Sequence, residues 1–162
     1  MQTYHINISG RVQGVGFRPF VCRLASQNHL TGTVANSTNG LDIYINTTEV
    51  KARDFYSEIL LHAPENGIIT NHHLEKTNPV QFSDFRIIES SGKGEPDLLI
   101  TPDIAICRDC RTEITDKYNR RKGYAFTTCL QCGPRYSIIQ SIPYDRKNTT
   151  MSPLKMCPDC NR

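Results

Sequence analysis

The first residues of the chain alternate between apolar and polar side chains. Over residues 3–9, tyrosine and isoleucine fall on one face of an extended segment and polar residues on the other. This period of two predicts a half-buried β-strand. After a glycine-rich turn, apolar residues recur at helical spacing from Pro19, which suits a first helical turn, to about Asn28. We therefore expect a helix there.

The pattern continues with a hairpin, a second helix and weaker strands. Residues 31–46 indicate two strands joined at Asn39 and Gly40, a dipeptide typical of tight hairpin turns. The expected elements that follow are a helix over residues 49–63 and strands near residues 67–74 and 84–89. The order strand, helix, strand, strand, helix, strand is typical of a ferredoxin-like βαββαβ fold. We predict the α+β class, with both helices on one face of an antiparallel sheet.

Cysteine is distributed unevenly along the 162 residues. Six of the seven cysteines lie between Cys107 and Cys160. Two unlike parts are therefore expected, because composition changes sharply near residue 91. The predicted boundaries are a domain over residues 1–91, a linker over residues 92–100 and a cysteine-rich region over residues 101–162. The first part is long enough to bury a core, whereas the second needs a metal or disulfides.

Charge and hydropathy narrow the class of protein. The formal net charge of +3 is too small to indicate a polyanionic partner by itself. No stretch approaches the roughly 18 apolar residues of a membrane span, and the first ten residues lack the pattern of a signal peptide. We expect a soluble, cytoplasmic protein, in which paired cysteines are more often metal ligands than disulfides.

The turn GRVQGVGFRPF lies between the first expected strand and helix. Such a turn directs free backbone N–H groups toward one point, and the helix dipole favours an anion there. Gly14 and Gly16 permit close backbone approach, and Arg18 can add a guanidinium. The predicted phosphate-binding residues are Gln13, Gly14, Val15, Gly16, Phe17 and Arg18. The turn matches no nucleotide-binding motif, and its spacing alone leaves a plain turn with a surface arginine equally open.

Two C-x2-C pairs have the spacing of a zinc site. Cys107 and Cys110 are followed, after eighteen residues, by Cys129 and Cys132. Two such pairs present four thiolates to one tetrahedral ion. We predict a structural zinc ion here. Iron with the same ligands, or disulfides and free thiols, are the alternatives.

A third pair, Cys157 and Cys160, lies close to the end of the chain. It offers two of the four ligands that a tetrahedral zinc site needs. We predict half of a second zinc site, whose other pair lies outside these residues. A different grouping of the three pairs around metal is the alternative.

A basic stretch lies between the first two cysteine pairs. Arg120, Arg121 and Lys122 stand beside Tyr118 and Tyr124. Basic and aromatic residues together are one signature of nucleic-acid binding. The low net charge favours a solvated loop instead.

The glycine-rich turn and the hairpin together resemble the signatures of acylphosphatases. GRVQGVGFRPFV is similar to the first signature block of that family, and GTVANSTNGLDIYI to the second. The resemblance implies a ferredoxin-like enzyme that hydrolyses carboxyl-phosphate mixed anhydrides. It implies that Arg18 binds the phosphoryl group and that Asn36 holds the attacking water. Such a reaction needs charge neutralisation and a positioned water, without a metal at that site.

Motifs in the second part extend the resemblance to the HypF family, the carbamoyltransferases of NiFe-hydrogenase maturation. These motifs are TPDIAICRDC, CLQCGPRYSII, IPYDRKNTTM and MCPDC. The resemblance implies that residues 1–91 are an acylphosphatase-like domain that cleaves carbamoyl phosphate. It implies that residues 101–162 are a zinc-finger region with an incomplete second finger. In that family, later domains transfer the carbamoyl group to the partner HypE, where it becomes a cyanide ligand of iron.

The chain differs from that family in ending after the third cysteine pair. We therefore expect an N-terminal fragment that carries out only the first partial reaction, the hydrolysis of carbamoyl phosphate or another acyl phosphate. The alternative is a catalytically inactive module whose cysteine-rich region docks a protein or nucleic acid.

Overall fold

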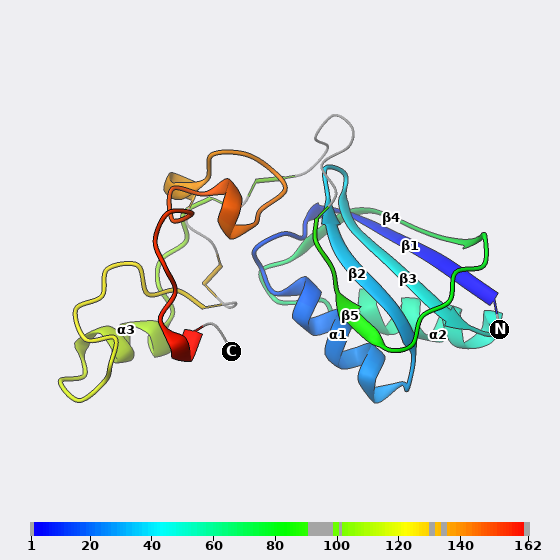
Figure 1. The fold of residues 1–162 in the computed structure, drawn as a ribbon, viewed down its shortest axis with the longest axis horizontal. Helices are drawn as coiled ribbons and strands as arrows, with labels where there is room; N and C mark the ends of the chain where they lie inside the picture. The colour runs from blue at the N-terminus through cyan, green and yellow to red at the C-terminus, as the bar shows by residue number, and fades with distance from the viewer. Residues whose placement is uncertain (1, 91–98, 101, 130–131, 134–135, 161–162) are drawn as a thin grey trace.

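A computed structural model shows a sheet backed by helices, followed by a largely irregular second part (Figure 1). The structure describes residues 2–90, 99–100, 102–129, 132–133 and 136–160. The elements of the first part are β1 (Gln2–Arg11), α1 (Phe17–Gln27), β2 (Thr31–Ser37), β3 (Gly40–Thr47), α2 (Glu49–Leu61), β4 (Ile68–Thr77) and β5 (Phe85–Ile87). The described elements of the second part are α3 (Arg108–Thr115) and 3-10 turns at Tyr136–Ile138, Arg146–Asn148 and Pro158–Cys160. The predicted α+β class and element order are confirmed.

The strands form one mixed sheet in the order β4-β1-β3-β2-β5. β1 lies between β3 and β4 and is antiparallel to both, and β2 is antiparallel to β3. β5, however, runs parallel to β2, with Phe85 opposite Gly32. The prediction of a wholly antiparallel sheet is therefore wrong at this edge.

The path of the chain between β4 and β5 explains the parallel pair. The Val80 N–H donates to Thr3 Oγ1 (2.9 Å), and Asn46 Nδ2 donates to the Val80 C=O (2.8 Å). Because Thr3 and Asn46 lie at the ends of the central strands β1 and β3, this segment crosses the end of the sheet. It reaches the opposite edge, where β5 adds to β2 in the same direction.

α1 and α2 cover one face of the sheet (Figure 1). Side chains alternate between the two faces of a strand, so every second residue along β1 and β3 points toward the helices. The core is formed by Tyr4, Ile6, Ile8, Val12, Val15, Phe17, Val21, Ala25, Leu30, Val34, Leu41, Ile43, Ile45, Ala52, Phe55 and Ile59. This core anchors both ends of the turn that precedes α1, since Val12 and Phe17 belong to it.

The second part has little apolar core of its own. Of its described residues, Cys110 and Cys132 are the only members of the buried hydrophobic set, whereas Tyr118 is 84% exposed and Phe126 50% exposed. This composition is consistent with the expectation that the second part needs a metal. Most of the predicted linker, residues 92–100, lies outside the described residues. Among the described helices, none is long and apolar enough to cross a membrane.

Candidate active site and cysteine cluster

The turn between β1 and α1 presents unpaired backbone N–H groups at a helix N-terminus. Gly14 (φ 73°) and Gly16 (φ 88°) have left-handed backbone, which glycine adopts without the usual steric cost. Among the described residues, no group of another segment accepts a hydrogen bond from the backbone N–H groups of residues 14–18, and the first N–H groups of an α-helix have no partner within the helix. Such amides at the positive end of a helix dipole are suited to binding an anion.

Gln13 fixes this turn to the β2–β3 hairpin. Its side chain is buried, and Nε2 donates to the C=O groups of Ser37 (2.6 Å) and Gly40 (2.9 Å). The Gln13 side chain therefore ties the turn to the β2–β3 hairpin, while Val15 and Phe17 anchor the turn in the core. We predicted that the backbone amide of Gln13 helps to bind phosphate, and that role stays a prediction; the contacts described here are those of its side chain.

Asn36 lies near the end of β2, beside the same hairpin, and is 1% exposed. Its Nδ2 donates to the Tyr144 C=O (3.2 Å). Its Oδ1 is buried and has no hydrogen-bond partner among the described residues. A buried acceptor without a partner costs about 1–3 kcal/mol, and in native proteins it points to a functional role.

Arg18, in the first turn of α1, forms an ion pair with Asp145 of the second part. Arg18 Nη1 lies 3.0 Å from Asp145 Oδ1, and both side chains are largely buried. The neighbouring Tyr144 N–H donates to Gln13 Oε1 (2.8 Å). Gln13, Arg18 and Asn36, all predicted from the sequence, therefore meet at one dipeptide of the second part.

Sequence reasoning missed Tyr144 and Asp145. Tyr144 acts through its backbone, which no side-chain pattern reports, and it lies 108 positions from Asn36 in the sequence. The stretch IPYDRKNTTM carries these residues. It entered the sequence interpretation only as part of a family resemblance, and nothing in it indicated contact with the glycine-rich turn.

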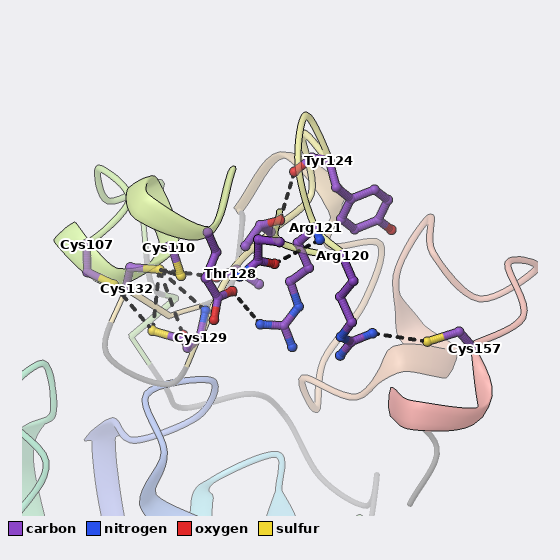
Figure 2. A network of polar contacts seen from close by, with 12 residues as sticks. Cys107, Cys110, Arg120, Arg121, Tyr124, Thr128, Cys129, Cys132 and Cys157 are labelled. Carbon is purple, nitrogen blue, oxygen red and sulfur yellow. Dashed lines mark hydrogen bonds and ion pairs between the residues drawn. The ribbon is translucent and has the colours of Figure 1, made fainter. Parts of the chain in front are cut away.

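The first two cysteine pairs meet in one cluster (Figure 2). The Sγ atoms of Cys107, Cys110, Cys129 and Cys132 all lie within 4.8 Å of one another. The Sγ–Sγ distances are 3.5 Å for Cys107 and Cys129, 3.9 Å for Cys129 and Cys132, and 3.7 Å for Cys110 and Cys132. Four thiolates at tetrahedral Zn–S distances lie about 3.8 Å apart. The donor set therefore fits a zinc ion.

The thiols of this cluster differ in acidity. Burial and the neighbouring thiols raise the pKa of Cys110. Burial acts in the same direction on Cys132, but hydrogen bonds from Thr128 and the backbone outweigh it and lower the pKa of Cys132 to about 6. The Thr128 hydroxyl lies 3.5 Å from the Cys132 sulfur. A bound cation would favour the thiolate form of all four cysteines.

The third cysteine pair does not join this cluster. Cys157 is exposed, and its Sγ lies 3.4 Å from Arg120 Nη1 (Figure 2). The Cys160 side chain lies outside what the structure describes, so the half-site stays a prediction.

In the basic stretch of residues 120–122, Arg120 contacts Cys157 and Arg121 pairs with Glu113. Two of its three cationic groups are therefore engaged within the chain.

Comparison with known proteins places the first part in a family. The family model described as acylphosphatase matches residues 4–87. An acylphosphatase of Staphylococcus aureus is 36% identical over 89 residues, which are 54% of this chain and 100% of that protein. The chain belongs to the acylphosphatase family. The acylphosphatase match covers the glycine-rich turn, Arg18 and Asn36.

This acylphosphatase family member also resembles HypF proteins over nearly its whole length. The model described as the HypF finger matches residues 106–139. The carbamoyltransferase HypF of Rhodobacter capsulatus is 41% identical over 160 residues, 99% of this chain and 21% of that protein. A crystal structure of full-length HypF in the phosphate- and nucleotide-bound form has a TM-score of 0.90 at 40% identity, with coverage of 99% of this chain and 21% of that one. The chain thus spans about a fifth of these HypF relatives.

Proposed function

We propose that this chain hydrolyses acyl phosphates, and carbamoyl phosphate in particular. One observation carries the proposal: the unpaired amides of residues 14–18 lie at the start of α1, close to Arg18 and Asn36. Arg18 and Asn36 contact two adjacent residues, Asp145 and Tyr144. Membership of the acylphosphatase family supports it. The proposed domains are residues 1–91 for this activity and residues 101–162 for a zinc-finger region.

Each site residue has a chemical role in this proposal. The amides of residues 14–18 and the Arg18 guanidinium neutralise the phosphoryl oxygens, whose negative charge would otherwise repel the attacking water. Asn36 Oδ1, an acceptor without a partner among the described residues, accepts a hydrogen bond from that water and orients the water oxygen toward phosphorus. The carboxylate is a good leaving group, so positioning and charge stabilisation suffice.

The likeness to HypF supports a narrower substrate and a wider context. HypF relatives bear the name carbamoyltransferase, so we assign carbamoyl phosphate as the substrate. Hydrolysis of its P–O bond releases phosphate and carbamate. In a longer protein, further domains would activate the carbamate and transfer the carbamoyl group to HypE for cyanide ligand synthesis.

We also infer that the four-cysteine cluster binds a structural zinc ion. Cys107, Cys110, Cys129 and Cys132 would hold it through their thiolates, and the Sγ–Sγ distances in the structure support this donor set. With all four positions taken by protein, such a site has no open coordination position for substrate. The zinc therefore stabilises the fold of the second part and takes no part in hydrolysis.

Phosphate release tests the proposed activity. The purified chain should release inorganic phosphate from carbamoyl phosphate and acetyl phosphate in the presence of a magnesium chelator. Arg18→Ala and Asn36→Ala should each lower kcat/KM by at least about 100-fold, the usual size of losing one oriented donor or acceptor. Arg23→Ala is the matched control, because Arg23 lies in the same helix with an exposed side chain. Full activity in both site variants would refute the proposal.

A further inference from the structure

The backbone of Tyr144 is held between two residues of the candidate site. Its N–H donates to Gln13 Oε1 (2.8 Å), and its C=O accepts from Asn36 Nδ2 (3.2 Å). Figure 1 shows this segment of the second part beside the turn that precedes α1. Free acylphosphatases, such as the 89-residue match from Staphylococcus aureus, are matched only by the first part of this chain. The contact is thus an addition to the acylphosphatase domain.

Asp145, the next residue, places its negative charge beside Arg18, the arginine that would bind the phosphoryl group. Its carboxylate lies 3.0 Å from Arg18 Nη1, and the two side chains are 19% and 24% exposed. The carboxylate does not fill the amide site, because the N–H groups of residues 14–18 are unpaired among the described residues. A phosphoryl group bound at these amides would therefore share Arg18 with a second anion.

Tyr144 also binds the side chain that would hold the attacking water, through the hydrogen bond from Asn36 Nδ2. Asn36 Oδ1 is fully buried and has no partner in the described residues. Water must reach this oxygen if Asn36 is to orient it. Tyr144 and Asn36 must therefore move apart before hydrolysis can occur.

Resting on the proposed function, we propose that Tyr144 and Asp145 are a gate on the acyl phosphate site, and that Asp145 determines how tightly the site binds its anion. In the closed arrangement, Asp145 pairs with Arg18 and the Tyr144 C=O accepts a hydrogen bond from Asn36. The phosphoryl group opens the gate by competing with the Asp145 carboxylate for the Arg18 guanidinium. Substrate binding in the first part thereby becomes coupled to the position of the second part.

An orienting role for Asp145 would have the opposite consequence. A carboxylate that only held Arg18 in place would help catalysis, and its removal would lower kcat. The burial of Asn36 Oδ1 argues against this role, because the dipeptide that contacts Arg18 is also hydrogen-bonded to Asn36 in an arrangement in which that oxygen is inaccessible to water. The two roles are therefore separable by kinetics.

The first test follows the gate in the unaltered protein with inorganic phosphate as the probe. Titration of ¹⁵N-labelled protein should shift the amide resonances of residues 14–18, and those of Tyr144 and Asp145 should shift with the same phosphate dependence. A response of residues 14–18 without any response of Tyr144 and Asp145 overturns the gate. Absence of a response at residues 14–18 overturns the proposed function itself, so the two failures are distinguishable.

The second test is the isosteric variant Asp145→Asn. Removal of one negative charge a few ångström from the bound anion should lower the KM for acetyl phosphate and the inhibition constant of phosphate, each on the order of tenfold. The value of kcat should not fall. Asp84→Asn is the matched control, because Asp84 pairs with Arg86 on the exposed surface, and its constants should not change.

A fall in kcat with an unchanged inhibition constant in Asp145→Asn overturns the gate and favours an orienting role. Kinetic constants equal to those of the unaltered protein also overturn the gate. Metal content and the melting temperature show whether the variant is folded. If it is not, the phosphate titration of the unaltered protein still decides.

Discussion

The first ninety residues and the cysteine-rich remainder differ in what can hold them together. In the first part, apolar side chains of β1, β3, α1 and α2 form one continuous core. In the described remainder, Cys110 and Cys132 are the only buried members of the hydrophobic set, and they belong to the four-cysteine cluster. Burial of apolar area stabilises the first part, and we infer that the proposed metal stabilises the second.

The candidate site joins these two unlike parts. The amides of residues 14–18 lie on the well-packed part, and Tyr144 and Asp145 come from the part that depends on the cluster. This arrangement suits a gate, because the segment with Tyr144 and Asp145 can shift while the core of the first part stays intact.

The largest expected effect comes from disruption of the cysteine cluster. Cys110→Ser should remove stoichiometric zinc, because it deletes one of four ligands, and structural zinc contributes about 10–16 kcal/mol of apparent binding free energy. Metal analysis and amide hydrogen exchange should show an unfolded second part and an intact sheet. Cys22→Ser is the control, since Cys22 lies in α1 outside the cluster. Retained zinc in Cys110→Ser would contradict the assigned ligand set.

A core substitution should have the converse effect. Phe55→Ala removes a side chain of α2 that is 1% exposed, so it should lower the free energy of unfolding by about 3–5 kcal/mol. Leu61→Ala in the same helix is the control, because Leu61 is 78% exposed, and it should cost less than about 0.5 kcal/mol. Urea denaturation measures both. Equal effects of the two substitutions would contradict the proposed core.

Local patterns in the sequence predicted most of the first part. The alternation in β1 and the turn at Asn39 and Gly40 depend on neighbouring residues, so short windows report them. The parallel pairing of β5 was not predictable in this way, because it depends on how residues near Val80 cross the end of the sheet.

The candidate site shows the same limit. The four-cysteine cluster was predictable, because short C-x2-C spacings place two ligands together in each pair. The glycine-rich turn indicated Arg18 as a phosphate-binding candidate, and the role of Asn36 came from a family resemblance. Their contacts with Asp145 and Tyr144 join residues more than a hundred positions apart, and no periodicity in the chain encodes such a contact.

Glycine substitutions should lower the free energy of unfolding more in the first part than in the second, with a smaller difference than the core substitutions. At Gly40 (φ +127°) an added Cβ would lie 2.1 Å from the Ile8 carbonyl oxygen, whereas at Gly123 (φ +70°) it would meet no atom within 4 Å. Gly40→Ala should therefore cost about 2–3 kcal/mol from strain and displacement, and Gly123→Ala about 1 kcal/mol from strain alone. Thermal unfolding and zinc content give the two readouts. Equal losses would mean that the turn at Gly40 relaxes freely.

The smallest expected effect is a pH dependence that has opposite signs in the two parts. His5 Nε2 lies 2.8 Å from Asp42 Oδ1 on the face of the sheet away from the helices, and the hydrogen bond to Asp42 raises the pKa of His5 against the effect of burial. Because the folded state binds this proton more tightly, the His5 contribution is complete below the ordinary histidine pKa of about 6.5 and is lost as pH rises through the folded value. Zinc binding strengthens over the same interval, because its thiolate ligands compete with protons.

Stability of the sheet, measured by urea denaturation, should therefore fall by about 0.5–1 kcal/mol between pH 6 and pH 8, while the zinc affinity of the cluster rises. Asp42→Asn should flatten the first dependence and leave the second unchanged. Asp54→Asn is the control, because Asp54 is exposed on α2. If Asp42→Asn altered the pH dependence of zinc affinity, the two parts would share a titrating group, and their separate means of stabilisation would no longer hold.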